Sequence, residues 1–273
     1  MSKPITVISP SERYAKIDLS ELWRFRELIV ILAMRDIKVR YKQTALGIAW
    51  SVIQPLFLMI IFSILFGRLA KIPSDGVPYP VFVFSGLLMW NFFSNGVSSC
   101  SNSLVGSSSM ISKVYFPRMA IPLASIGVSM IDFLISCCLL IIIMMVYSVS
   151  PNWQIMLVPL FAIGGFSSIL GIGLWLSAIT VTYRDFRFVV PFMMQIWMYV
   201  TPVIYPVSFI PEGYRWLVYL NPVMGWISGA RSAFLGTNID WIAVGVSCLL
   251  SAAMVIIGLK YFARAEQRFA DVI

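Results

Sequence analysis

A cluster of basic residues lies just before the first long apolar stretch of the chain and could bind phosphate. Lys38, Arg40 and Lys42 fall in the run Lys38-Val39-Arg40-Tyr41-Lys42. Basic side chains beside a bilayer attract anionic lipid or phosphate, and a guanidinium can hold a phosphate through two parallel hydrogen bonds. The same cluster would also serve as a topology signal alone, so the pattern leaves both interpretations open.

Other residues with catalytic or metal-binding chemistry are few. The 273-residue chain has no histidine, which is the commonest metal ligand and general base. Its four cysteines have neither zinc-site spacing nor the pattern of a disulfide framework. No G-x-x-x-x-G-K-[ST] phosphate loop occurs, so ATP binding by that route is excluded. We therefore expect no cofactor or metal in this chain, and an energy source on another polypeptide if transport is active.

Asp132 is the one acidic residue in the otherwise uncharged stretch from Met119 to Tyr183. Carriers driven by protons or sodium usually need several such groups, or broken helices with coordinating carbonyls. A lone carboxylate is more often satisfied by a neighbouring helix, and we expect this of Asp132.

Aromatic residues inside apolar stretches could line a path for sugars. Most Trp and Tyr residues of a membrane protein are expected in interfacial belts. Aromatic faces also stack on the apolar C–H faces of sugar rings without requiring one sequence of sugars. The residues that raise this possibility are Trp90, Phe92, Phe93, Trp197 and Tyr199. Nearby, the small polar residues of Ser94–Ser103 could pack closely against another helix or line an aqueous path.

Long uncharged runs place most of the chain in a bilayer. The chain is 59% hydrophobic and 12% charged, whereas soluble domains have about 25% charged residues. A bilayer core of about 30 Å needs about 20 apolar residues per helix. We predict an all-α membrane protein with six spanning helices, at about 45–66, 79–104, 119–147, 153–181, 188–205 and 239–260, with Pro151 and Asn152 separating the third from the fourth.

The distribution of basic residues predicts that both termini are cytoplasmic. No cleavable signal precedes the first span, and residues 1 to 42 hold nine basic residues. With six spans, sixteen of the twenty Lys and Arg residues fall on the inner side and four on the outer side. The net charge of +8 is therefore explained by orientation in the membrane, and nucleic acid is not expected as a partner.

Residues 20 to 40 read as an amphipathic helix in the membrane interface. Ser20 could cap it, and Leu22, Phe25, Ile29 and Leu32 recur at helical spacing on one face. A basic amphipathic helix of this kind lies in the headgroup plane. It could be an anchor only, or it could line an entrance or touch a partner protein.

The segment from Tyr205 to Gly236 is too apolar for an ordinary outer loop. It contains helix breakers such as Pro206, Pro211 and Asn221-Pro222, and too few residues for two more spans. Short re-entrant helices fit best, and such backbone is tolerated only when it is buried in protein or lines a cavity. The alternative is a folded cap that merely packs.

Several short motifs are spread along the chain. Val39 to Trp50 is followed by Gln54-Pro55-Leu56, and Phe116-Pro117-Arg118 is followed by Pro122-Leu123. The distal half has Tyr183-Arg184-Asp185, Thr201-Pro202-Val203-Ile204-Tyr205, Leu220-Asn221-Pro222 and Arg231. Together these motifs resemble the start, the second cytoplasmic connector and the distal half of the permease subunits of polysaccharide-exporting ABC transporters, over roughly residues 20 to 265.

The resemblance implies a homodimeric six-helix permease in the bacterial inner membrane that works with two copies of a separate ATPase, which binds ATP and Mg. Its domains would be a cytoplasmic segment 1–42, a permease domain 43–262 and a cytoplasmic tail 263–273. The expected substrate is a lipid-linked polysaccharide, with O-antigen first among O-antigen, capsule and teichoic acid. In the O-antigen and teichoic acid branches, the glycan is carried on undecaprenyl diphosphate.

On this hypothesis, the diphosphate meets the basic cluster, the glycan passes the five aromatics and Arg231, and the chain is not itself an enzyme. The ATPase would contact the connector through Lys113, Tyr115, Phe116 and Arg118. One alternative is a permease that exports drugs or small lipids. Another is a membrane-embedded enzyme acting on polyprenyl glycans, for which only Asp132 and Asp185 are near candidates. A third is a structural scaffold.

Overall fold

The structure is a computed structural model, which describes residues 19–42, 47–111, 113, 115–267 and 269. Within these ranges the chain forms helices and turns and no strands, as predicted for an all-α protein. The α-helices of six or more residues are α1 (Leu19–Arg24), α2 (Arg26–Lys42), α3 (Ala49–Phe62), α4 (Tyr79–Gly106), α6 (Ala120–Val146), α7 (Val158–Thr182), α8 (Phe186–Val200), α10 (Met224–Leu235) and α11 (Trp241–Glu266). The remaining helical elements are η1 (Ser63–Leu69), α5 (Ser108–Ile111), η2 (Trp153–Leu157), η3 (Val207–Phe209), η4 (Glu212–Tyr214) and α9 (Arg215–Tyr219).

Five of the predicted spans are confirmed by helices that are long and apolar enough to cross a membrane. In the described part of the chain these are Ala49–Leu69, Tyr79–Gly106, Ala120–Val146, Trp153–Thr182 and Trp241–Glu266. The first predicted span also included residues 45 and 46, which lie outside the described residues. The break at Pro151-Asn152 is confirmed, since the Asn152 side chain accepts a hydrogen bond from the Trp153 amide where η2 begins.

The span predicted at 188–205 is wrong in length. Its helix, α8, has 15 residues and ends at Val200, which gives it about 22 Å against a bilayer core of about 30 Å. Thr201 leaves the helix with extended backbone, because the ring of Pro202 disfavours the helical conformation for the preceding residue.

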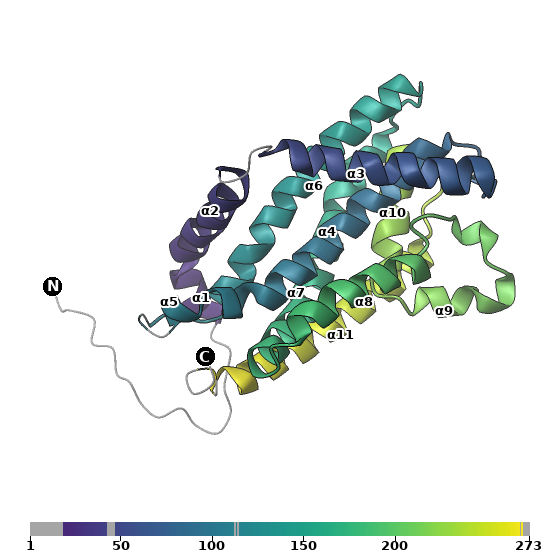
Figure 1. The fold of residues 1–273 in the computed structure, drawn as a ribbon. Helices are drawn as coiled ribbons and strands as arrows, with labels where there is room; N and C mark the ends of the chain where they lie inside the picture. The colour runs from purple at the N-terminus through teal and green to yellow at the C-terminus, as the bar shows by residue number, and fades with distance from the viewer. Residues whose placement is uncertain (1–18, 43–46, 112, 114, 268, 270–273) are drawn as a thin grey trace.

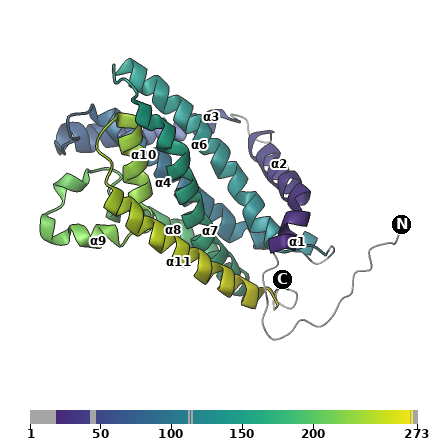
Figure 2. The ribbon, with the colours of Figure 1, turned by 180° about the vertical axis from the view of Figure 1, so that it is seen from behind.

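Helix α4 is the centre of the bundle, and α6, α7, α8 and α10 surround it (Figure 1). Its first half is buried almost without interruption from Val81 to Trp90. Helices α7 and α11 run side by side in both ribbon views (Figure 2). They cross closely because Gly171 faces Gly258, where an added side chain would collide with the backbone of the other helix.

A helix is present over the predicted range but is divided in two at Phe25, and its location in a membrane interface stays a prediction. Helix α1 is described from Leu19 onward, so the predicted cap at Ser20 stays a prediction. The predicted apolar stripe is confirmed: Leu22, Phe25, Ile29 and Leu32 pack on a hydrophobic cluster with α6 and the end of α11.

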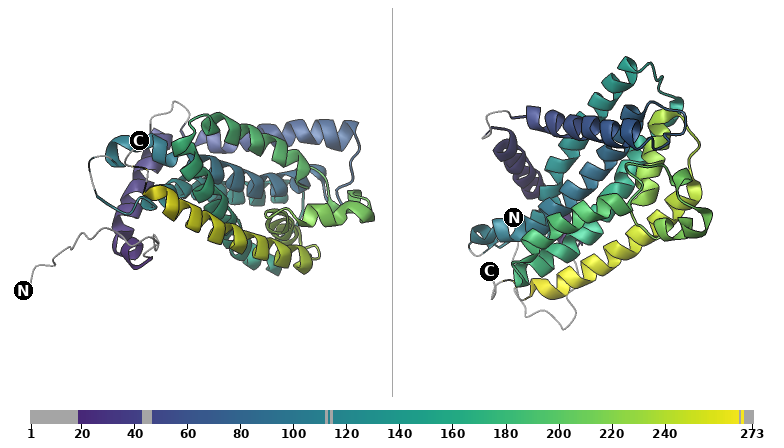
Figure 3. Two further views of the ribbon diagram at one scale, coloured as in Figure 1. Left: turned by 90° about the horizontal axis from the view of Figure 1, so that it is seen from below. Right: turned by 45° about the vertical axis from the view of Figure 1, so that its right-hand side comes forward.

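The segment between α8 and α11 lies at the end of the bundle opposite α1 (Figure 3). We call these two ends the α9 end and the α1 end. Helix α10 is largely buried among α4, α7 and α11. The Trp226 indole N–H fixes it there by donating to Ser168 at 3.1 Å and to Ser251 at 3.0 Å. Short helices in this segment agree with the sequence, and their re-entrant depth in a membrane stays a prediction.

Candidate functional site

The lone intramembrane carboxylate is paired with an arginine of the predicted phosphate-binding cluster. Arg40, in the last turn of α2, places Nη2 2.7 Å from Oδ2 of Asp132 in α6. The other carboxylate oxygen, Oδ1, accepts hydrogen bonds from the Tyr41 hydroxyl at 2.7 Å and the Ser51 hydroxyl at 2.6 Å. The expectation that a neighbouring helix would satisfy Asp132 is confirmed for Oδ1 by two hydrogen bonds and for Oδ2 by the ion pair alone, and two helices contribute.

Close packing of α2 along α6 makes this pair possible. The absence of a side chain at Gly127 lets Ala33 approach α6, since an added Cβ would lie 3.2 Å from the Ala33 Cβ. Two turns further along α2, Arg40 and Tyr41 then reach Asp132, which lies about 18 Å along α6 from its first residue. Arg40 of the basic cluster therefore contacts α6 near the middle of that helix.

Burial makes these contacts energetically important. Asp132 is 9% exposed, and an unpaired carboxylate in such a place would be costly. Burial, and then the hydrogen bond to Asp132, raise the pKa of Tyr41 above its usual value. The phenol therefore stays protonated at neutral pH and remains a donor to the carboxylate.

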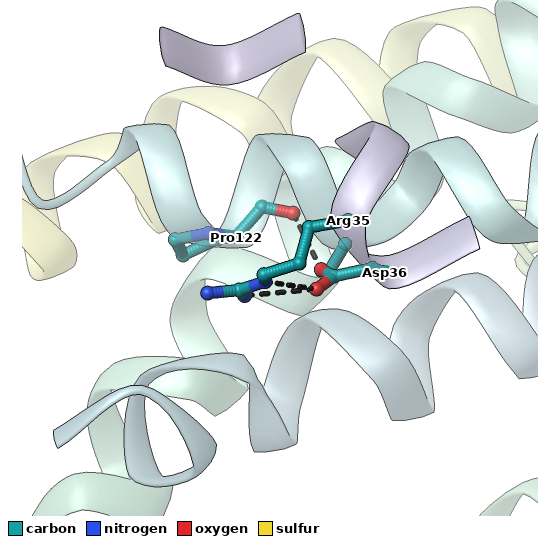
Figure 4. A network of polar contacts seen from close by, with 4 residues as sticks. Arg35, Asp36 and Pro122 are labelled. Carbon is teal, nitrogen blue, oxygen red and sulfur yellow. Dashed lines mark hydrogen bonds and ion pairs between the residues drawn. The ribbon is translucent and has the colours of Figure 1, made fainter. Parts of the chain in front are cut away.

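A polar cavity of about 300 Å³ adjoins this pair, between α2, α4 and α6. Helix α2 contributes Arg35, Asp36 and Arg40 to its wall. Helix α4 contributes Ser99, Asn102, Ser103 and Gly106, and Ser107 follows directly after it. Helix α6 contributes Ile121, Ser125 and Val128. Arg35 donates to Oδ1 of Asp36 through Nε at 2.9 Å and Nη2 at 2.8 Å, beside Pro122 in the first turn of α6 (Figure 4). Each of the two arginines in the wall is thus held by a carboxylate, surrounded by side chains that can donate hydrogen bonds.

The structure separates the three residues of the basic cluster. Arg40 lines the cavity, whereas Lys38 and Lys42 are exposed and do not. Sequence reasoning missed Arg35, Asp36, Tyr41 and Ser51 as parts of this site. The available signal was that a single acid in the spans needs a cation within reach, and Arg40 is a cation at the end of the helix before the first span.

The predicted aromatic lining is mostly core in this chain. Trp90, Phe92 and Phe93 are buried, because α4 is enclosed by other helices. Trp197 of α8 packs against Phe93 at a centroid distance of 5.4 Å, and Phe92 packs against Phe133 of α6 at 4.9 Å. Of the five rings, Tyr199 alone is exposed. Trp197 is partly buried, so the other four rings are placed to pack within the bundle.

The predicted ATPase-docking residues are also divided. Lys113 and Tyr115 are exposed, whereas Phe116 is buried in the cluster at the α1 end. Arg118 is used within the chain, since its Nη1 donates to the backbone carbonyl of Glu266 at 2.6 Å. Phe116 and Arg118 thus fasten the connector to the end of α11, which leaves Lys113 and Tyr115 as the surface that a partner can reach.

Arg231 is buried near the α9 end, far along the bundle from the cavity just described. Its Nη2 donates to the carbonyl of Val203 at 2.6 Å, and its guanidinium lies over the Phe82 ring at 4.1 Å. Gly86 makes room for this arrangement, because a side chain there would collide with Arg231 and with the Val203 carbonyl.

A helical bundle whose described residues include five span-length apolar helices, with a polar cavity beside them, defines a multi-pass membrane protein. The comparison with known proteins narrows the class. The chain belongs to the ABC-2 type transporter family, whose sequence profile matches residues 27–235. It is therefore a membrane subunit of an ABC transporter and works with an ATPase partner.

The chain is similar over most of its length to permeases of known name. It is 28% identical over 251 residues to the O-antigen export system permease protein RfbA of Klebsiella pneumoniae, covering 90% of this chain and 95% of that protein. It is 30% identical over 217 residues to RfbA of Myxococcus xanthus, covering 78% and 82%. The polysialic acid transport protein KpsM of Escherichia coli is 22% identical over 249 residues, covering 86% and 92%.

Proposed function

We propose that this chain is the permease of an exporter that moves lipid-linked polysaccharide, with O-antigen as the expected glycan, across the bacterial inner membrane. The observation that carries the proposal is similarity over nearly the whole chain to permeases named for O-antigen export. The lower identity to a polysialic acid transport protein makes capsule polysaccharide the second candidate. In this proposal two copies of the chain and two of an ATPase, which binds ATP and Mg, form the exporter, with both termini cytoplasmic.

We further propose that the cavity between α2, α4 and α6 receives the diphosphate of the lipid carrier. Guanidinium groups pair with carboxylate and phosphate in the same bidentate manner. The carboxylates on Arg35 and Arg40 therefore occupy positions that phosphate oxygens could take. The Ser99 hydroxyl and the Asn102 amide, whose second N–H is not used by its bond to the Ser98 carbonyl, add uncharged polar groups beside them. A cavity for drugs or small lipids would instead be lined mainly by apolar side chains.

Genetic deletion tests the function. Loss of the gene should remove the glycan from the cell surface and cause the lipid-linked precursor to accumulate in the cytoplasmic leaflet. The wild-type gene should restore the surface glycan. Unchanged surface glycan after deletion would refute polysaccharide export by this chain.

A pair of variants tests the diphosphate site. Arg40→Ala should impair export although the protein is still inserted at wild-type levels. Lys38→Ala is the matched control, because it removes an exposed cation from the same helix that does not line the cavity. Equal effects of the two substitutions would indicate general attraction to anionic lipid, and wild-type export by Arg40→Ala would refute the diphosphate role.

A further inference from the structure

A second polar cavity, of about 210 Å³, lies at the α9 end of the molecule. Its wall includes Phe82 at the start of α4, Ser228 and Arg231 of α10, Ser208 of η3, and the carboxylates Asp75 and Asp240. The cavity is smaller than the range of about 300–1,000 Å³ typical of sites for drug-sized ligands. It is thus suited to a ligand of about one ring.

The arginine in this wall carries a buried charge without a carboxylate partner. Arg231 is 7% exposed and forms no ion pair with the described residues. Its contacts are the Val203 carbonyl and the Phe82 ring, and its Nε, also buried, has no hydrogen-bond partner in the described structure. Because a buried guanidinium left in this state is costly, a ligand that accepts a hydrogen bond from it would be stabilising.

The two carboxylates decide which ligand fits. Asp75 accepts a hydrogen bond from the Ser208 hydroxyl at 2.9 Å. Asp240 caps α11, because its Oδ1 accepts hydrogen bonds from two backbone amides in the first turn. Its Oδ2 accepts a hydrogen bond from the Tyr219 hydroxyl at 2.6 Å. With two carboxylates and one guanidinium, the wall has a net negative charge, which disfavours an anion such as phosphate. A neutral polyol has hydroxyl groups that can accept a hydrogen bond from Arg231 and donate one to Asp75. It therefore gives the arginine an acceptor without adding negative charge beside the two carboxylates.

From this combination of size, charge and hydrogen-bonding groups we infer that the cavity binds one neutral sugar unit of the glycan at the α9 end of its path. The inference rests on the proposed export of polysaccharide, but not on the diphosphate site. Three separate parts of the chain hold the arginine in place: α10 carries it, the Val203 carbonyl accepts from it, and α4 supplies Phe82 and the space at Gly86. The site is therefore formed before any sugar arrives.

Saturation-transfer NMR on the purified chain in lipid nanodiscs tests this inference, because it detects weak sugar binding. The probes are D-galactose, D-mannose and N-acetyl-D-glucosamine. At least one should show saturation of its ring protons. Asp75→Asn should weaken that binding about tenfold, because a neutral amide oxygen replaces the charged acceptor of the hydrogen bond. Asp185→Asn, an exposed carboxylate outside the cavity wall, is the matched control and should bind as the wild type does.

A second variant keeps the test independent of one hydrogen bond. Ser228→Trp should fill the cavity and abolish the sugar signal, with a thermal melt to show that the variant is folded. The inference is overturned if no probe is saturated, if folded Ser228→Trp still binds, or if inorganic phosphate displaces the sugar. Failure here combined with loss of surface glycan on gene deletion would reject the sugar site alone, whereas unchanged surface glycan on deletion would reject the proposed function.

Discussion

Neutralising Asp132 should separate its structural role from its effect on ligand binding. In the structure Asp132 forms an ion pair with Arg40 at 2.7 Å and accepts hydrogen bonds from the hydroxyl groups of Tyr41 and Ser51. Asp132→Asn keeps the side-chain shape and one carbonyl oxygen, which can still accept from Tyr41 and Ser51. What it removes is the charge that holds Arg40.

The size of the effect follows from the exposure of the two partners. Asp132 is buried, but the Arg40 side chain is 40% exposed, so solvent screens the pair. We estimate its contribution at about 1–2 kcal/mol, between an exposed pair and a fully buried one. If the diphosphate must displace Asp132 from Arg40, removing the competitor should tighten its binding by the same free energy, or about 5- to 30-fold. The free energy of unfolding should fall by about 1–2 kcal/mol.

Binding of farnesyl diphosphate to the purified chain in nanodiscs, measured by isothermal titration calorimetry, provides the assay. Asp132→Asn should bind it more tightly than the wild type, and Arg40→Ala more weakly. In the double variant the gain from Asp132→Asn should disappear, because there is no arginine to release. Farnesyl monophosphate should show a smaller change. The competition argument fails if Asp132→Asn leaves affinity unchanged, or if the gain persists without Arg40.

Three further predictions concern packing, and thermal unfolding of the purified protein measures each. Gly258→Leu should destabilise the protein by about 1–3 kcal/mol by forcing α7 and α11 apart, whereas Gly245→Leu, with open space around it, should not; equal melting temperatures would refute the close crossing. Gly86→Ala should destabilise more than Gly106→Ala, because only the first collides with the buried arginine and a carbonyl; the reverse order would contradict the arrangement. Trp226→Phe should cost about 1 kcal/mol through loss of its hydrogen bonds to two serines, and no loss would show that these bonds are not stabilising.

Local signals in the sequence were sufficient to predict the spans. Uncharged runs and a Pro-Asn break are properties of neighbouring residues, so five spans and the break at Pro151-Asn152 are confirmed. The short α8 was also predictable in principle. The run of apolar residues continues past Val200, but Pro202 disfavours helical backbone at Thr201 and so ends the helix there.

The site residues were less predictable because the contacts join distant parts of the chain. Arg40 and Asp132 are 92 positions apart, and no periodicity in either helix indicates that they meet. For the aromatic residues, the sequence identified the rings but did not indicate whether they are buried. Composition identified the rings of α4, but only the position of α4 at the centre of the bundle shows that Phe92 and Phe93 pack in the core.

The polar half of α4 packs closely on one face and lines the polar cavity on another. Ser99, Asn102, Ser103 and Gly106 follow helical spacing of three and four residues, so they share the face that lines the cavity. Ser101 and Cys100 point elsewhere, into α7. There the Ser101 and Thr180 hydroxyl groups lie 2.9 Å apart, and a side chain at Gly173 would collide with Cys100. Close packing on one face thus fixes the helix against α7, and this positions the hydroxyl groups of the other face beside the two arginines.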